Sequence, residues 1–400
     1  MNRNLMTSDV TTSGAEQTTD ARVIVTDEVR ATLKCGHATR LVLPEQYSYA
    51  TLSPSDRPQV GDIILARIAK LGRHTKIDDC DGRRVTLFEG DLLTAVYGNR
   101  YATDQYEGRV PQTVKPCHIL SQAAVCGEMK SKHASMPTPT ELEVVGFMHD
   151  AQERRMNLRD FGLPLRRKVI PPIKSDSMAK RSAVIVVVGS SMNSGKTMTT
   201  ASVVRGLTLG GYRVAAGKIT GTACGNDTWA YKDNGAIHTL DFSDCGFPST
   251  YLCDDEEVMG IYRTLRHQLT KEKPDFIVME IADSIIQRET RRLLERQEFK
   301  ESIDHLLFAA GDSLAAESGL RWLNWRGYKP GALSGLVSAS PLAKAEAEEL
   351  TGTYCYTREE IIAGKLNELL KPVSEPNRET HPGVSASKTQ SLPTEPLEWR

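Results

Sequence analysis

The chain has 400 residues, of which 25% are charged, and its formal net charge is -1. This length exceeds what a single hydrophobic core usually fills, so we expect two domains. The balance of cations and anions excludes a global basic field, and we expect no nucleic-acid partner. The sequence has no apolar run that could span a bilayer, and its first residues lack the apolar core of a signal peptide. We therefore expect a cytoplasmic protein with no membrane partner.

The eight cysteines form no Cys-x-x-Cys pair and no dense cluster. This pattern is typical of reduced thiols in cytosolic proteins. Cys35, His37, Cys117 and His118 contain the soft ligand atoms that zinc prefers, but their spacing is unlike that of known zinc sites. Ordinary core and surface roles are the favoured interpretation of these residues.

The first part of the chain has a β-rich pattern, after a lead-in at 1–20 whose polar composition predicts disorder. Short runs typical of strands lie between 21 and 165, and Asp81-Gly82 is a hairpin signal. Such spacing predicts a small β-barrel or sandwich domain. The prolines and cations of 166–182 predict a linker. The predicted strands are 22–25, 63–68, 84–88, 92–97, 143–148 and 155–158.

From 183 to 371 the pattern alternates between strand and helix, and a Pro/Ser/Glu/Thr-rich tail predicted to be disordered follows at 372–400. The alternation predicts a doubly wound, mostly parallel α/β sheet, whose ligands bind at the carboxyl ends of the strands. The expected strands are 183–188, 213–218, 237–242, 275–280, 305–310, 332–337 and 353–356. The expected helices are 198–207, 256–269, 287–297, 314–325 and 342–350.

The strongest motif follows the first of these strands. Residues 184–188 form a β-branched run typical of a buried parallel strand, and the loop after them ends in Gly195-Lys196-Thr197. Such a loop presents backbone N–H groups to phosphate oxygens, and the helix that follows adds its positive dipole. We expect Lys196 to reach the terminal phosphates and Thr197 to bind Mg²⁺. The residues expected to hold the nucleotide are Gly189, Ser190, Ser191, Met192, Asn193, Ser194, Gly195, Lys196, Thr197 and Met198.

Two further strand ends carry charged residues. Lys218 ends the second strand, where a lysine is well placed to meet an anion, and the long polar segment 223–235 after it is typical of a substrate loop. Glu280 ends the fourth strand, where a carboxylate binds Mg²⁺ or orders a water in phosphate-loop proteins. Asp283 could share that role. Lys196, Lys218 and Glu280 are therefore the expected catalytic residues.

The loop from Gly189 to Thr197 resembles the Gly-x5-Gly-Lys-Thr loop of dethiobiotin synthetase and the cobyrinic acid synthases, because five residues separate its two glycines where the usual pattern has four. Lys218 with Thr220-Gly221 is similar to the end of that family's second strand. The resemblance covers at most 183–370. It implies a Mg²⁺ site made by Thr197, Asp227 and Glu280, with Asp233 as a competitor of Asp227. The Asn-Ser-Gly-Lys-Thr ending is also similar to the phosphate-loop proteins of molybdopterin-guanine dinucleotide biosynthesis.

The nucleotide is expected to be ATP, because no Asn-Lys-x-Asp guanine motif is present and the segment after the sixth strand reads Ser338-Ala339-Ser340-Pro341. The resemblance implies a ligase or synthetase that phosphorylates a carboxylate or carbamate of a small metabolite and then forms an amide or a ring. Two alternatives stay open: a regulatory or assembly-factor NTPase whose β domain binds a partner, and a kinase or acyl-transfer enzyme. The oligomeric state is open, with a homodimer among the options.

Overall fold

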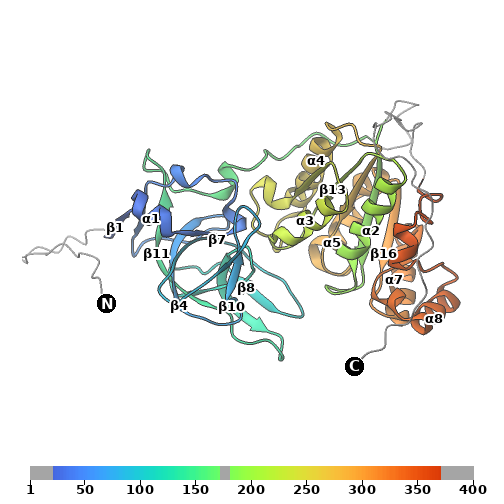
Figure 1. The fold of residues 1–400 in the computed structure, drawn as a ribbon, viewed down its shortest axis with the longest axis horizontal. Coiled ribbons are helices and arrows are strands. Elements are labelled where there is room, and N and C mark those ends of the chain that lie inside the picture. Colours follow the sequence, from blue (N-terminus) through green and yellow to red (C-terminus); the bar gives the residue numbers. More distant parts are fainter. Residues whose placement is uncertain (1–20, 172–180, 371–400) are drawn as a thin grey trace, which may run out of the picture.

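The computed structural model describes residues 21–171 and 181–370 and contains two large sheets, one in each half of the chain (Figure 1). We call 21–171 the barrel part and 181–370 the α/β part. The predicted disordered ends, 1–20 and 372–400, and residues 172–180 of the predicted linker lie outside the described residues. None of the helices in the described ranges combines the length and apolar character that a bilayer crossing requires.

The barrel part is built on a nine-stranded sheet that closes on itself. β11 pairs with β4, β4 with β7, and β7 with β10, and β9 then pairs with both β10 and β11 to complete a ring. Ring closure leaves these strands without a free edge, which is how small barrels avoid edge-to-edge pairing. The elements of this part are β1 (Ala21–Ile24), α1 (Asp27–Thr32), β2 (Lys34–Cys35), β3 (Tyr49–Leu52), β4 (Ile63–Lys70), β5 (Lys76–Asp78), β6 (Arg84–Thr86), β7 (Leu92–Tyr97), β8 (Tyr106–Arg109), β9 (Cys117–Ile119), β10 (Val125–Lys132) and β11 (Glu141–His149).

Five of the six strands predicted here are present, and β5 and β6 form the hairpin expected around Asp81-Gly82. The predicted strand at 155–158 is wrong. Arg155 makes only an isolated bridge with His149. The Asn157 side chain then accepts a hydrogen bond from the backbone N–H of Arg159 and starts a 3-10 turn at Leu158–Asp160. A side chain that satisfies the backbone locally competes with strand pairing.

The α/β part holds a six-stranded sheet in which every pair of neighbours is parallel, in the order β14-β13-β15-β12-β16-β17. The predicted α/β fold class is therefore confirmed. The strands are β12 (Ala183–Gly189), β13 (Val214–Lys218), β14 (His238–Asp241), β15 (Phe276–Glu280), β16 (His305–Ala309) and β17 (Ala332–Ser334). The helices are α2 (Lys196–Leu209), α3 (Gly225–Asp233), α4 (Asp255–Thr270), α5 (Arg288–Glu295), α6 (Gln297–Glu301), α7 (Ser313–Trp325), α8 (Pro341–Thr351) and α9 (Arg358–Ile362).

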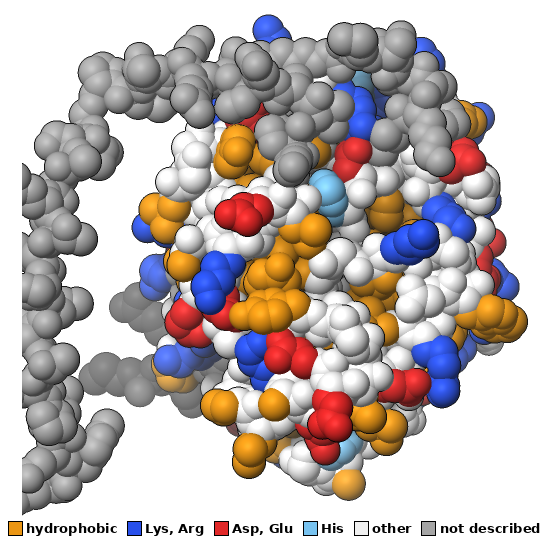
Figure 2. All heavy atoms as spheres, turned by 90° about the vertical axis from the view of Figure 1, so that its right-hand side faces the viewer, with side chains coloured by type: hydrophobic (Ala, Val, Ile, Leu, Met, Phe, Trp, Pro, Cys, Tyr) orange, Lys and Arg blue, Asp and Glu red, His pale blue; other side chains and the backbone are white. Residues whose placement is uncertain are grey.

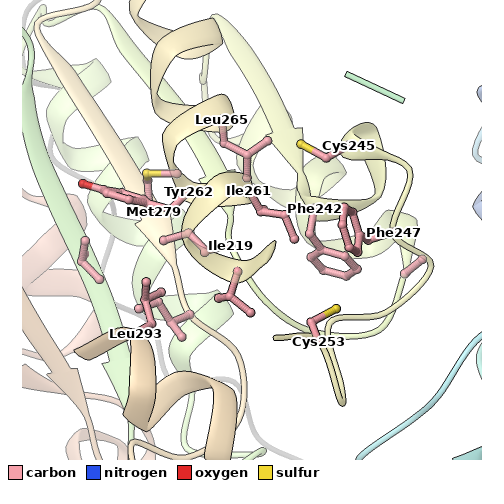
Figure 3. Close-up of a cluster of buried hydrophobic side chains, with 14 of the residues drawn as sticks. Ile219, Phe242, Cys245, Phe247, Cys253, Ile261, Tyr262, Leu265, Met279 and Leu293 are labelled. Carbon is pink, nitrogen blue, oxygen red and sulfur yellow. The ribbon is translucent and has the colours of Figure 1, made fainter. Parts of the chain in front are cut away.

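Helices cover both faces of this sheet. Val184, Val186 and Val188 of β12 join one apolar cluster with α4, α5 and α7, whereas Ile185 and Val187 join another with α2, α3 and α9. Both faces of the strand are buried, which explains its continuous apolar sequence. Figure 3 shows how the first cluster continues from α4 to Phe242 and Phe247, in the segment between β14 and α4.

Several predicted elements of the α/β part differ in detail. Residues 353–356 form no strand, since Cys355 makes only an isolated bridge with Leu333. The helix predicted at 287–297 is two helices, because Arg296 has an extended backbone. The segment 223–235, predicted to be a substrate loop, contains α3. Its buried Tyr231 packs in the cluster beneath α2, so tertiary contacts stabilise a helix whose own sequence is mostly polar.

The face of the α/β part that carries α7 and α8 mixes charged and apolar side chains (Figure 2). Its exposed apolar residues include Leu314, Trp325 and Leu342, which are 71%, 82% and 84% exposed. This face lies on the far side from the barrel part (Figure 1). The functional residues predicted from the sequence gather at the carboxyl ends of β12, β13 and β15 instead.

Candidate functional site

The loop between β12 and α2 has the backbone geometry of a phosphate-binding loop. Gly195 caps α2 with a left-handed backbone (φ 93°), so the first helical residue is Lys196. A Cβ atom on Gly189 would lie 2.3 Å from Oγ of Ser194, so the side of the loop that faces the strand end has room only for glycine. Backbone N–H groups at the start of α2 have no partner within the helix and are therefore available to an anion.

Side chains of the loop stabilise this conformation. Oγ of Ser194 donates to the carbonyl of Ser191 at 3.0 Å, and Oγ of Ser190 accepts from the N–H of Gly311 at 3.1 Å. The amide of Asn193 donates to Asp104 of the barrel part. Each of the serines at these positions therefore holds the loop in shape, while Asn193 ties it to the other half of the molecule.

Lys196 lies across the loop, with Nζ donating to the carbonyls of Ser191 at 2.5 Å and Met192 at 3.3 Å. Its side chain is buried. Burial lowers the pKa of Lys196 from its usual value, and the nearby Lys218 lowers it further, against the effect of Glu280. A phosphate in the loop would replace these contacts with neutral carbonyls by a contact between opposite charges.

Thr197, Asp227 and Glu280 come together although they are far apart in the sequence. Oγ1 of Thr197 lies 3.3 Å from Oδ1 of Asp227 and 3.1 Å from Oε1 of Glu280. Asp227 lies in the first turn of α3, which directs its carboxylate back to the loop. Asp233 ends the same helix and is exposed. Of the two competing aspartates, the structure places Asp227 in the site.

Lys218 faces both carboxylates. Nζ lies 2.5 Å from Oδ2 of Asp227 and 3.2 Å from Oε1 of Glu280, because Lys218 and Glu280 are register partners on β13 and β15. Burial alone would lower the pKa of Lys218, but the two carboxylates outweigh it and raise the pKa above its usual value. Burial would raise the pKa of Glu280, yet Lys218 and Lys196 hold it below its usual value. The two lysines therefore favour the ionised form of the Glu280 carboxylate.

Two residues near Glu280 complete this arrangement. The buried Tyr231 donates its hydroxyl to Oε2 of Glu280, a role that its position in a polar segment of the sequence does not indicate. Asp283 lies three residues after Glu280 with a left-handed backbone (φ 60°). Burial raises the pKa of Asp283 to about 6, although Lys196, Lys218 and Arg100 act in the opposite direction.

The residues around Lys196 and Lys218 line a cavity of about 280 Å³, which we call the first cavity. The barrel part supplies one of its walls, through Arg100, Tyr101 and Gln105. No role for these residues follows from the sequence, because no local motif surrounds them. They reach the site only because the two parts pack together: Arg40 of the barrel part, for example, donates to Ser243 at 2.8 Å.

A separate cavity of about 220 Å³ lies on the other side of the loop. Gly195 and Met198 line it from α2, and Ser338 and Ala339 line it from the segment after β17. That segment is the one whose sequence lacks a guanine motif. The two cavities therefore flank the loop. Charged residues line the first, whereas mainly apolar atoms line the other, beside Arg358 and Glu359.

Thr197, Asp227 and Glu280 form a set of hard oxygen donors, which fits Mg²⁺. No group of three or more His, Cys, Asp or Glu side chains within 21–171 and 181–370 is arranged to hold a metal ion, and this includes Cys35, His37, Cys117 and His118. Mg²⁺ commonly uses one or two carboxylates together with phosphates of its substrate. The hydroxyl and two carboxylates found here suit that mode of binding.

Comparison with known proteins yields distant structural likenesses only. No family model matches the chain, and no curated protein matches it. Solved structures with some likeness are the 54 kDa signal recognition particle protein from Aeropyrum pernix K1 in complex with GDP (18% identity, TM-score 0.33) and the receptor FtsY from Elizabethkingia anophelis in complex with GDP (12%, 0.32). Chloroplast FtsY from Physcomitrella patens is a third (14%, 0.30).

These matches cover 49%, 46% and 48% of this chain, and the chain spans 49%, 58% and 57% of theirs. The chain therefore spans about half the length of these three structures. Identities and TM-scores this low show neither the family nor the function of the chain. None of the three is a dethiobiotin synthetase, so that resemblance stays a prediction.

Proposed function

We propose that the protein binds Mg·ATP on the loop from Gly189 to Met198 and transfers the γ-phosphoryl group to a carboxylate or carbamate of a small metabolite. The observation that carries the proposal is the contact of Thr197 with both Asp227 and Glu280, beside Lys196 and Lys218. Two lysines and a set of oxygen ligands at the start of a helix are what binding of a triphosphate with its metal requires.

Each residue of the site has a role in this proposal. Lys196 and Lys218 neutralise charge on the γ-phosphoryl group as the transfer proceeds. Thr197, Asp227 and Glu280 hold Mg²⁺, which when bound neutralises phosphate charge. The hydroxyl of Tyr231 holds the Glu280 carboxylate in one orientation. The mainly apolar cavity beside Gly195 and Met198 is the proposed binding site of the adenine ring.

The proposed transfer forms a bond between the acceptor oxygen and the γ-phosphorus and breaks the bond from that phosphorus to the bridging oxygen, which leaves with ADP. The product is an acyl phosphate. An amine of the substrate then attacks its carbonyl carbon, inorganic phosphate leaves with the bonding electron pair, and the amine proton passes to solvent. The result is an amide or a ring, as the resemblance to dethiobiotin synthetase implies.

Nucleotide binding and hydrolysis test this proposal. We expect Lys196→Ala and Glu280→Gln to weaken Mg·ATP binding or hydrolysis by about tenfold or more, because each removes a charge-assisted contact of about 1.5 to 3 kcal/mol. Lys329→Ala, which removes an exposed lysine, serves as the matched control. Binding of a fluorescent ATP analogue and release of ADP are the measurements. Unchanged values in both site variants would show that the site is elsewhere.

A parallel titration with GTP decides the nucleotide, which we propose to be ATP. Screening metabolites for compounds that accelerate ADP release then identifies the acceptor, and ³¹P NMR of the products distinguishes the reaction classes. A stable phosphorylated product would identify a kinase. Acceleration by a macromolecule in place of a metabolite would identify a regulatory NTPase.

A further inference from the structure

A second cavity adjoins the first at the junction of the two parts. It has a volume of about 420 Å³, within the usual range for sites that bind small molecules. Arg100, Gln105, Thr222 and Cys224 line both cavities, so the two are direct neighbours. Most of the second cavity's wall comes from the barrel part, and none of the described residues that line it is an aspartate or glutamate.

The floor of this cavity carries polar atoms that the protein leaves without hydrogen bonds. Arg100, His74 and Ser121 are 7%, 7% and 5% exposed, so each is more than nine-tenths buried. Within the described residues, Nε and Nη1 of Arg100, Nδ1 of His74 and Oγ of Ser121 have no partner. A buried polar atom without a partner costs about 1 to 3 kcal/mol, and more if it is charged. Nε and Nη1 of Arg100 and Oγ of Ser121 are donors, which a negatively charged group of a ligand would satisfy.

The charge of the cavity defines the ligand. Within the described residues the guanidinium of Arg100 makes one hydrogen bond, from Nη2 to Gln105 at 2.6 Å. Burial lowers the pKa of Arg100 only to about 10, so it stays a cation at neutral pH. Burial lowers the pKa of His74 to about 3, so its imidazole is neutral. Three exposed cations, Arg73, Lys76 and Arg84, also line the cavity. Nε of Arg84 lies 3.3 Å from Oδ1 of Asp78. An anion is the ligand that matches these groups.

We propose that the second cavity binds an acidic group of the substrate, whose other acidic group lies in the first cavity as the phosphoryl acceptor. The substrate is then a small organic dianion, with its distal acidic group bound by Arg100 and Ser121. This inference rests on the proposed function, and it gives the barrel part a role as the substrate-binding part of the enzyme. Arg100 lines both cavities and therefore lies between the proposed positions of the two acidic groups.

Calorimetric titration of the full chain, saturated with Mg²⁺ and a non-hydrolysable ATP analogue, tests the proposal. Malonate represents a dicarboxylate and glycerol 3-phosphate a phosphate monoester, so the two arms distinguish the chemistry of the distal group. We expect saturable binding of at least one. Arg100→Gln should weaken it by about tenfold or more, which corresponds to a lost charged hydrogen bond. Ser121→Ala removes one hydroxyl group and Lys76→Gln removes an exposed charge. Each should weaken anion binding two- to fivefold.

Lys329→Gln is the matched control, because it removes an exposed lysine outside both cavities. The proposal is overturned if neither anion binds saturably, or if the cavity variants bind as tightly as Lys329→Gln. Should Arg100→Gln fail to fold, Ser121→Ala and Lys76→Gln decide the question. Nucleotide binding without anion binding would refute this inference alone. Anion binding by a protein that binds no nucleotide would refute the proposed function and the substrate role together.

Discussion

At the scale of single residues, the site contains more acidic groups than its lysines neutralise. Lys196 and Lys218 face Asp227 and Glu280, and Asp283 is a third carboxyl group close by. Its pKa of about 6 follows mainly from burial, which disfavours the charged form. The raised pKa means that the folded protein binds this proton more tightly than the unfolded chain. Ionisation of Asp283 therefore lowers stability as the pH rises from about 4 through 6.

Asp283→Asn removes this ionisation without adding strain, because asparagine tolerates the left-handed backbone at this position. Above pH 6 we expect the variant to be more stable than the wild type by roughly 2 to 3 kcal/mol, since one pKa unit is about 1.4 kcal/mol. Near pH 4 the difference should fall to about 0.5 kcal/mol, because the carboxyl group of the unfolded chain is then about half protonated. Urea unfolding with EDTA and without nucleotide measures it. Asp233→Asn, an exposed change, is the control, and an equal gain at both pH values would contradict the assignment.

At the scale of elements, the turn from β12 into α2 depends on Gly195. Its backbone is left-handed, and a Cβ atom there would lie 3.0 Å from Cα of Gly335, in the segment that follows β17. Gly195→Ala should therefore shift the loop against that segment, in addition to the cost of about 1 kcal/mol for a left-handed alanine. We expect nucleotide affinity to fall about tenfold or more in a fluorescence titration.

Gly211 provides the matched control for this prediction. It has a similar backbone (φ 84°), but a Cβ atom there would meet nothing within 4 Å. Gly211→Ala should cost about 1 kcal/mol of stability and leave nucleotide affinity within twofold of the wild type. If both variants lose affinity equally, backbone strain alone explains the effect and the contact with Gly335 is irrelevant.

At the scale of the whole molecule, the two parts share a core and a buried ion pair. One apolar cluster runs from the barrel part into the face of the sheet beneath α4. Nη2 of Arg40, in the barrel part, lies 2.5 Å from Oδ1 of Asp244 and 3.5 Å from Oδ1 of Asp241, both in the α/β part. Both carboxylates are largely buried, so removing the guanidinium would leave them without their cation.

Arg40→Met should therefore lower the free energy of unfolding by about 3 kcal/mol, the usual cost of breaking a buried pair on one side. Arg321→Met breaks an exposed pair with Glu317 and should cost less than about 0.5 kcal/mol. Urea unfolding followed by tryptophan fluorescence compares the two variants. Similar costs for both would show that Arg40 contributes little to the joining of the two parts.

The sequence by itself determined the parts of this protein that depend on local patterns. The β-branched run of β12, the glycines of the loop and the alternation of strands and helices indicated a parallel sheet with a phosphate-binding loop. Because the carboxyl ends of parallel strands meet at one edge, this pattern also pointed to Lys218 and Glu280. Each strand, turn and helix in this pattern is encoded by residues that are neighbours in the sequence.

Only the tertiary structure decided which distant side chains share a site. The sequence alone does not distinguish Asp227 from Asp233 as a candidate metal ligand. The direction of α3 places Asp227 against Thr197. Arg100, His74 and Ser121 carry no motif, and they become a candidate site only where the closed barrel packs against the α/β part. How the two parts pack depends on the whole apolar surface of each part. The short-range hydrophobic pattern of the sequence does not say which of these surfaces meet. The walls of the candidate site therefore had to come from the fold, while the sequence alone predicted a phosphate-binding loop.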